Sequence, residues 1–205
     1  MTPLDFVQAE SLACERGGRP VFRDVNFRVP HGQVLIVEGP NGSGKTSLLR
    51  LIAGLLAPAG GSLSISIGGT PIEDREERGK FIGWLGHHDG LKPQLTPRES
   101  LQFFAQLYHA TANDISALLE AIGLNRAADL PCQYLSAGQK KRLGLARLKL
   151  CSRPLWLLDE PLASLDASGR SLLLDSLRNH FSAGGIAVIA THDPLALEAM
   201  RLQLT

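Results

Sequence analysis

Hydrophobic residues recur along this chain with two periods that alternate over most of its length. Three short apolar runs are typical of buried strands: Val34-Leu35-Ile36-Val37, Leu155-Trp156-Leu157-Leu158 and Ile186-Ala187-Val188-Ile189-Ala190. Residues 62–67 alternate polar and apolar positions, which indicates a half-buried strand, and residues 81–85 form a further candidate strand. Uninterrupted apolar runs of this length favour a mostly parallel sheet covered on both faces.

Helical patterns follow most of these runs. The segment Thr96-Pro97-Arg98-Glu99 is a helix start, with a Thr cap, Pro at the first position and Glu three residues after the Thr. A breaker cluster at 57–61 and Gly123 end two of the helical segments. We predict helices after residue 46, from 96 to about 108, over 113–122, from about 136, over 168–182 and over 194–200. Short strands are expected at 6–7, 25–29 and from 201.

The strongest chemical signal lies where the first buried strand passes into a helix. Residues 39–46 read Gly-Pro-Asn-Gly-Ser-Gly-Lys-Thr, the pattern of a phosphate-binding P-loop. Glycines let the backbone wrap around a phosphate, and the helix N-terminus points its N–H groups at the anion. We expect Lys45 to reach the β- and γ-phosphates and Thr46 to ligate Mg²⁺. A glycine-rich turn with an unrelated lysine is the simpler alternative. The predicted nucleotide-binding residues are Gly39, Pro40, Asn41, Gly42, Ser43, Gly44, Lys45, Thr46 and Ser47.

Two carboxylates close the apolar run that begins at Leu155. Asp159 and Glu160 lie at the carboxyl end of this predicted strand, which is the edge of a parallel sheet where ligands bind. Asp159 can hold Mg²⁺ beside Thr46, and Glu160 can orient or deprotonate the water that attacks a γ-phosphate. Apolar runs that end in Asp-Glu are also common as plain strand ends, so this assignment depends on the upstream P-loop.

A small-residue turn precedes a basic segment that begins at Lys140. Free N–H groups and a hydroxyl at such a helix start can bind an anion, although an ordinary helix cap explains the turn equally well when it is considered alone. Its position shortly before the carboxylate pair favours the anion site. The residues of the turn are Leu135, Ser136, Ala137, Gly138 and Gln139.

The composition narrows the class of protein. The chain has 205 residues, 44% of them hydrophobic, which suits one large domain with an inserted subdomain. A net charge of +1 argues against an electrostatic nucleic-acid binder. We expect a soluble chain without a signal peptide, because no basic segment opens it and no apolar run approaches the roughly 20 residues of a spanning helix. Cys14, Cys132 and Cys151 are expected to be free thiols in a reducing compartment rather than metal ligands.

Taken in order, these motifs resemble those of ABC-type ATPase domains. The order is the P-loop, Leu-Ser-Ala-Gly-Gln at 135–139, the carboxylate strand at 155–160, Ala-Ser-Leu-Asp at 163–166 and His192 after a strand. The resemblance implies an α/β fold: a P-loop NTPase (RecA-like) core with an N-terminal antiparallel β subdomain and an inserted α-helical subdomain. Residues 1–90 and 154–205 are expected to form the nucleotide-binding core of this single domain, and residues 91–153 its helical part.

The same resemblance implies roles for individual residues. Two chains form a head-to-tail homodimer, with ATP and Mg²⁺ held between the P-loop of one subunit and the 135–139 turn of the other. Lys45 and Glu160 are catalytic, His192 contacts the γ-phosphate, and Asp166 links the two sites across the dimer. Considered alone, His192 would be assigned as a surface or capping histidine.

A closer resemblance is to the ATP-binding subunits of the haem exporter in cytochrome c maturation (the CcmA family). It rests on residues 14–17, 84–87, Ala137, 146–148 and 153–161. That family works with integral membrane permease subunits at the cytoplasmic face of the bacterial inner membrane, where ATP hydrolysis releases a haem-loaded chaperone. The resemblance therefore implies a peripheral membrane location. We expect no nucleic-acid partner and no direct haem binding, because the paired histidines 87 and 88 fall beside the nucleotide site.

The sequence departs from the ABC pattern at two positions. His88 stands where these ATPases usually carry a glutamine that ligates Mg²⁺, and imidazole is a poorer ligand for a cation that prefers oxygen. We expect His88 to point toward the γ-phosphate. Arg16 stands where an aromatic residue usually stacks on adenine. Its guanidinium plane can stack on a base, and the alternative is a solvated arginine on a glycine-rich turn.

Two surface patterns leave alternatives open. The apolar stripe of Phe103, Phe104, Leu107 and Tyr108 is most simply core, and otherwise a groove for a helix of a membrane subunit. The basic residues 140–142 and Arg147 are interpreted as a solvated helix face. At the level of function, the alternatives are an ABC ATPase with another cargo and a nucleotide-gated assembly module with little turnover.

Overall fold

The computed structural model describes residues 4–72, 74–86, 90–110 and 115–205, and within them the strands form two sheets. The antiparallel sheet has the order β2-β1-β4-β5 and the parallel sheet the order β6-β7-β8-β3-β9. The antiparallel strands are β1 (Phe6–Arg16), β2 (Arg19–Pro30), β4 (Gly60–Ile67) and β5 (Thr70–Pro71). The parallel strands are β3 (Val34–Glu38), β6 (Ile82–Leu85), β7 (Leu155–Asp159), β8 (Ile186–Ala190) and β9 (Met200–Gln203).

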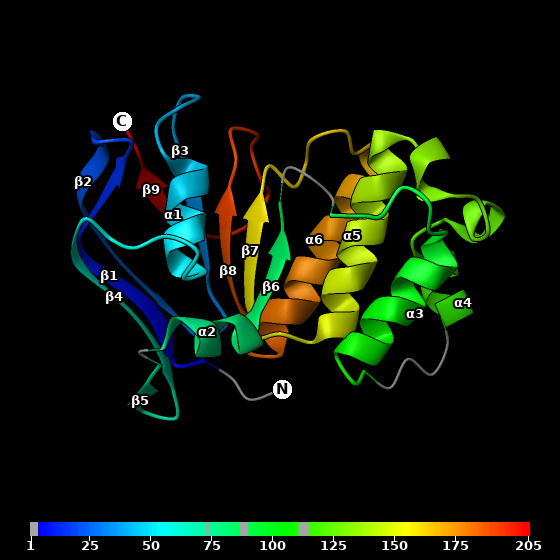
Figure 1. The fold of residues 1–205 in the computed structure, drawn as a ribbon, viewed down its shortest axis with the longest axis horizontal. Helices are drawn as coiled ribbons and strands as arrows, with labels where there is room; N and C mark the ends of the chain where they lie inside the picture. Colours follow the sequence, from blue (N-terminus) through cyan, green and yellow to red (C-terminus); the bar gives the residue numbers. More distant parts are fainter. Residues whose placement is uncertain (1–3, 73, 87–89, 111–114) are drawn as a thin grey trace.

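Helices cover both faces of the parallel sheet (Figure 1). On one side, α1 lies between this sheet and the antiparallel sheet, whereas α5 and α6 lie on the other side, with α3 and α4 beyond them. The helices are α1 (Lys45–Ile52), α2 (Arg75–Arg78), α3 (Pro97–Leu107), α4 (Ile115–Ala121), α5 (Ala137–Cys151) and α6 (Ala167–Ser182). Short 3-10 turns occupy Gly79–Phe81, Asn125–Ala127 and Cys132–Tyr134.

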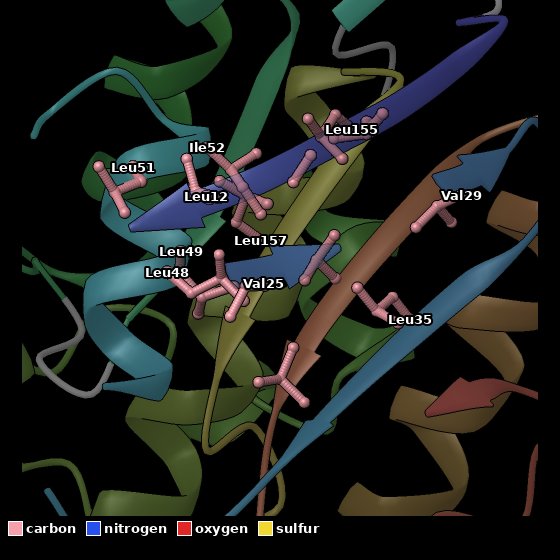
Figure 2. Close-up of a cluster of buried hydrophobic side chains, with 14 of the residues drawn as sticks. Leu12, Val25, Val29, Leu35, Leu48, Leu49, Leu51, Ile52, Leu155 and Leu157 are labelled. Carbon is pink, nitrogen blue, oxygen red and sulfur yellow. The ribbon is translucent and has the colours of Figure 1, made fainter. Parts of the chain in front are cut away.

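The buried strands divide their side chains between two hydrophobic clusters. Leu155 and Leu157 join the cluster on the α1 side, and Trp156 and Leu158 join the cluster on the α5 and α6 side, because successive residues of a strand point to opposite faces. Figure 2 shows the first cluster, in which side chains from β1, β2, β3, α1 and β7 meet. The P-loop helix is thereby held from both sides by apolar packing.

A third cluster packs α3, α4 and the 3-10 turns Asn125–Ala127 and Cys132–Tyr134 against α5. Leu143 and Ala146 of α5 belong to this cluster, while Leu145 and Leu148 belong to the cluster under the parallel sheet. The helix α5 therefore contacts both the sheet and the helical part. No helix in the described part of the chain is long and apolar enough to cross a membrane.

The structure confirms the predicted fold class and most of the predicted elements. The helix start at Thr96 is a complete capping box, in which Thr96 and Glu99 each accept a hydrogen bond from the other's backbone N–H, at 3.2 and 2.8 Å. The N-terminal strands are longer than expected, because bulges in β1 interrupt the alternation that a single strand would show. Cys14, Cys132 and Cys151 are free, and burial raises the pKa of each thiol.

The helix predicted over 194–200 is wrong. Those residues are irregular up to Met200, where β9 begins and pairs with β3 in parallel. Leu195 is buried and Leu197 and Ala199 pack partly against the same cluster, so the segment is anchored at alternate positions. A segment this short gains too few helical hydrogen bonds to fold as a helix against such packing.

Candidate active site

The P-loop joins β3 to α1 and holds its lysine inward. Lys45 is 7% exposed, and its Nζ donates to the carbonyl oxygens of Gly39 at 2.7 Å and Pro40 at 3.0 Å. A Cβ on Gly39, whose φ is +151°, would lie 2.4 Å from the carbonyl oxygen of Leu204. Only glycine fits there, so the start of the loop is closely packed. The two hydrogen bonds of Lys45 retain its ammonium group inside the loop.

A cavity of about 430 Å³ opens over the loop, and we call it the P-loop pocket. Its volume falls within the range of roughly 300–1,000 Å³ that is typical of small-molecule sites. The pocket brings the P-loop together with the carboxylates at the end of β7, which are distant in the sequence. Its lining consists of Arg16, Val21, Asn41, Gly42, Gly44, Lys45, Thr46, Ser47, Asp159 and Glu160.

Two oxygen-bearing side chains that are 113 residues apart in the sequence meet in this pocket. The Thr46 hydroxyl donates to Oδ2 of Asp159 at 2.8 Å, and Asp159 is 5% exposed. A hydroxyl and a buried carboxylate at this separation are the hard oxygen donors that Mg²⁺ prefers. The residues present therefore fit a magnesium ion.

Glu160 and His192 face each other across the ends of neighbouring strands. Asp159 pairs with Ala190 in the sheet, and the Glu160 N–H donates to the Ala190 carbonyl at 2.8 Å. Nδ1 of His192 lies 3.0 Å from Oε1 of Glu160, and this hydrogen bond raises the pKa of the imidazole. Glu160 has a φ of +47°, a conformation that costs a non-glycine residue free energy and is concentrated at functional sites. Its Oε2 is buried and has no hydrogen-bond partner among the described residues, so it remains available as an acceptor.

The turn at 135–139 lines a second, separate depression of about 600 Å³, which we call the signature pocket. Ser136 caps α5: its Oγ accepts from the Gln139 N–H at 3.2 Å, and Oε1 of Gln139 accepts from the Ser136 N–H at 2.9 Å. A Cβ on Gly138 would lie 2.7 Å from the Ser164 carbonyl oxygen, so only glycine allows this contact. The lining consists of Gly123, Ser136, Ala137, Gly138, Gln139, Arg142, Ser164 and Asp166.

Asp166 connects the signature pocket to α6, the helix that follows it. Its Oδ1 accepts from the Gly169 N–H at 2.9 Å and from Nη2 of Arg142 at 2.5 Å. The Gly169 hydrogen bond, with Arg142 as the next cause, lowers the pKa of this carboxyl below its ordinary value. Arg142 also donates to Oγ of Ser168 at 2.7 Å. The start of α6 is thereby tied to α5.

The two pockets have no lining residue in common. The P-loop and the carboxylates Asp159 and Glu160 are gathered in one pocket, whereas Ser136 to Gln139 and Asp166 are gathered in the other. A single chain therefore does not bring the signature residues to its own P-loop. Arg16 lines the P-loop pocket, and His88 lies outside the described residues.

Sequence reasoning missed several lining residues. Val21 belongs to the P-loop pocket, and Gly123, Arg142 and Ser164 belong to the signature pocket. Ser164 lies within the Ala-Ser-Leu-Asp motif, but only its backbone makes the close contact, so its side chain carried no signal. Val21 is an ordinary strand residue whose position depends on pairing between β1 and β2.

The interpretation of the basic helix face needs correction, and the apolar stripe is divided between its two alternatives. The basic face of α5 is not solvated, because Lys141 is 4% exposed and Arg142 and Arg147 bind groups on other elements. The apolar stripe is not simply core, because Phe103 is 48% and Leu107 55% exposed. Phe104 and Tyr108 are half-buried, under the guanidinium groups of Arg147 and Arg153.

Comparison with known proteins agrees with this geometry. The family described as ABC transporter matches residues 22–163. A cytochrome c biogenesis ATP-binding export protein CcmA of Rhodopseudomonas palustris (strain BisB5) is 44% identical, over 97% of this chain and 98% of its own length. The protein of the same name from Pseudomonas putida (strain GB-1) is 45% identical, over 92% of this chain and 90% of its own length.

Solved structures share the fold. An ABC transporter ATP-binding protein of Pyrococcus furiosus superposes with a TM-score of 0.82, at 24% identity and over 97% of both chains. The ATP-binding subunit of an ABC transporter superposes with a TM-score of 0.80, at 26% identity, over 91% of this chain and 79% of its own. The arrangement of the two sheets and the helical part is therefore that of a known class of ATP-binding subunits.

Proposed function

Because this chain belongs to the ABC transporter family, and within it to the CcmA family of cytochrome c biogenesis ATP-binding export proteins, we propose that it powers export of haem for cytochrome c assembly. It is an ABC-type ATPase, which converts ATP and water to ADP and phosphate. The observation that carries the proposed mechanism is the P-loop pocket, where a phosphate-binding loop and two carboxylates meet.

The phosphates of ATP are held by Lys45 and by backbone N–H groups of the P-loop, in which Pro40 has none. In the free chain the Lys45 ammonium group binds the carbonyl groups of Gly39 and Pro40, which keeps it at the loop until a phosphate replaces one of them. Thr46 and Asp159 would hold Mg²⁺, and bound Mg²⁺ supplies neutralisation of the charge on the β- and γ-phosphates. Arg16 is proposed to stack on the base, since it lines the same pocket.

Glu160 orients the attacking water and accepts its proton. Its partner in the free chain is His192, whose imidazole can turn toward the γ-phosphate because the residue is exposed. When the imidazole leaves, Oε1 joins Oε2 as an acceptor for the water. The hydrogen bond between Glu160 and His192 therefore restrains the base until a nucleotide is present.

The complete site needs a second chain. The signature pocket lies apart from the P-loop pocket, which supports a head-to-tail homodimer in which Ser136, Gly138 and Gln139 of one chain complete the other chain's site. Asp166 would link the two sites. The exposed residues Phe103 and Leu107 on α3 support docking to a membrane permease subunit, with the dimer at the cytoplasmic face of the inner membrane.

The test is phosphate release by the chain in complex with its membrane subunits. The wild-type complex is expected to release phosphate, and Glu160→Gln is expected to bind ATP but turn over at least about 100-fold more slowly. Retained turnover in Glu160→Gln would contradict the role of Glu160. Tight ATP binding with no turnover in the wild-type complex would instead indicate a nucleotide-gated assembly module. Release that responds to another cargo, and not to haem, would reassign the exporter.

A further inference from the structure

The helix α5 is fitted closely against the edge strand β6. A Cβ on Gly144 of α5 would lie 2.6 Å from Cδ1 of Leu85, and a Cβ on Gly83 of β6 would lie 2.9 Å from Cδ2 of Leu148. Each glycine therefore receives a leucine from the other element. Lys141, Gly144 and Leu148 share one face of α5, since they are three and four residues apart. This face fixes how far α5 can slide along β6.

Two cations on α5 bind the backbone at the end of β6. Nζ of Lys141 donates to the Gly86 carbonyl at 3.3 Å, and Nη2 of Arg147 donates to the Trp84 carbonyl at 3.1 Å. In the described part of the parallel sheet, β6 pairs only with β7, so alternate carbonyls on its outer side need partners from elsewhere. The helix α5 supplies those partners.

Lys141 carries a charge into a buried position at this edge of the sheet. Lys141 is 4% exposed, and removal of an ammonium group from water is far more costly than burial of a neutral donor. A neutral side chain could satisfy the Gly86 carbonyl at a smaller desolvation cost. The buried ammonium group is nevertheless held at this point of the backbone, because moving it away from the Gly86 carbonyl would leave a buried charge with one acceptor fewer.

That point lies where the two pockets can be coupled. Leu85 pairs with Leu158, the residue before Asp159, so the end of β6 lies beside the carboxylate edge of the P-loop pocket. At the other end of the contact, Lys141 follows the capped turn that begins α5 at Ser136. The contact between Lys141 and Gly86 thus joins the signature turn to the catalytic edge of the same chain.

We infer that Lys141 is a positioning residue, which sets the orientation of the signature turn relative to the P-loop pocket of its own chain. This inference rests on the proposed function, because orientation matters only if each signature turn completes the site of a partner. Each chain of a two-fold dimer must present both pockets at once, so an error in this angle misplaces both sites. Lys141 does not line the P-loop pocket, so we expect ATP binding to a single chain not to depend on it.

The experiment compares Lys141→Met with Lys140→Met in the full-length chain. Methionine keeps the length and removes the charge, and Lys140 is the adjacent lysine on the same helix without a hydrogen bond to β6 among those described. We expect Lys141→Met to lower kcat by about tenfold, since small misplacements of catalytic groups reduce rates strongly, while the Kd for ATP changes less than about twofold. Lys141→Arg is expected to restore kcat, and Lys140→Met to resemble the wild type.

Equal kcat for the two methionine variants would overturn the inference, and so would a loss of ATP binding in parallel with kcat. If Lys141→Met fails to fold, Lys141→Gln retains a neutral donor and is judged by the same split between kcat and Kd. Backbone hydrogen exchange over residues 82–86 gives a readout that does not need turnover. Faster exchange there in Lys141→Met than in Lys140→Met supports the contact between Lys141 and Gly86 as a restraint on β6, and equal exchange contradicts it. This result can be read even if the wild-type chain is inactive and the proposed function fails.

Discussion

The P-loop pocket and the signature pocket differ in depth and in how far their polar groups are already paired. Lys45 and Asp159 of the first are 7% and 5% exposed, whereas the Asp166 side chain of the second is 65% exposed. Ser136 and Gln139 cap each other. The first pocket therefore offers buried charge and a carboxylate oxygen that has no partner among the described residues, and the second offers a helix N-terminus that is already capped. On the proposed function, the first pocket supplies affinity for the nucleotide, and turnover requires the two pockets to meet.

Whether the two pockets of different chains form one site can be tested by disabling each pocket in a different chain. Lys45→Ala and Ser136→Arg are each expected to lower turnover by at least about 100-fold on their own. In an equimolar mixture, half of the dimers carry one chain of each kind, and each of these has one intact composite site. Phosphate release is therefore expected to return to about a quarter of the wild-type rate, as a two-fold head-to-tail arrangement requires.

The matched control mixes Lys45→Ala with Glu160→Gln, which are both defects of the P-loop pocket. Neither site of that mixed dimer is intact, so no recovery is expected. Recovery in the control, or none in the first mixture, would show that the sites do not form between chains.

Acid is expected to lower the stability of the fold through β7, the strand that carries Asp159 into the P-loop pocket. His180 of α6 stacks on Trp156 of β7 at a centroid distance of 4.0 Å, and its Nε2–H donates to the Ile186 carbonyl at 3.1 Å. Burial lowers the pKa of His180 from 6.5 to about 4. Between these two pH values the unfolded chain is protonated at His180 and the folded chain is not. The free energy of unfolding is therefore highest above pH 6.5 and decreases as the pH falls toward 4. The loss amounts to about 3 kcal/mol of unfolding free energy.

Urea denaturation between pH 4 and 7 measures this effect. His180→Phe keeps an aromatic ring on Trp156 and is expected to flatten the dependence. His192→Ala is the control, because the raised pKa of His192 stabilises the fold below pH 6.5 and the contribution is lost on the alkaline side. An unchanged acid slope in His180→Phe would contradict the assignment.

The proposed magnesium site predicts a smaller effect, which is limited to ATP binding in the presence of Mg²⁺. Thr46→Val keeps the β-branched shape of Thr46 and removes the hydroxyl that donates to Asp159. We expect the Kd for ATP with Mg²⁺ to rise about tenfold, the loss of one hydrogen bond to a charged group. With EDTA present, the variant and the wild type should bind ATP equally. An equal loss with and without Mg²⁺ would indicate that Thr46 acts on the fold of the loop instead.

The smallest predicted effect concerns the edge of the P-loop pocket. Arg16→Ala is expected to raise the Kd for ATP about threefold, the usual value of an exposed cation–π contact. Arg19→Ala is the matched control, since Arg19 is exposed on the neighbouring strand and does not line the pocket. An unchanged Kd in Arg16→Ala would leave Arg16 as a solvated residue.

The sequence predicts best where local pattern and burial agree. The strand Leu155–Asp159 is continuous, apolar and closed by charge, so its position follows from its own residues, whereas the role expected of Asp159 and Glu160 depends on the upstream P-loop. The Thr96 helix start is equally local, because every group in its capping box lies within four residues. The P-loop belongs to the same class. These features could be predicted without knowledge of the rest of the fold.

The remaining features depend on contacts between distant segments. A charged row on α5 looks solvated until β6 is placed beside it, and only then is Lys141 seen to be buried. The segment from Leu195 to Ala199 has helix-forming residues, but it leads directly into β9, which pairs with β3 in the parallel sheet. The low pKa of His180 likewise arises from burial against another element, where its ring stacks on Trp156 of β7. Single-residue propensities contain no information on such neighbours.

The mutual cap of Ser136 and Gln139 has a consequence for how fast two chains can join. Ser136 Oγ accepts a hydrogen bond from its own helix, and its proton stays free to be donated to an incoming phosphate oxygen. In the proposed dimer, no part of this cap has to be broken when a loaded partner arrives. Association then loses little conformational entropy at this surface, which favours rigid docking of two finished surfaces over folding on contact.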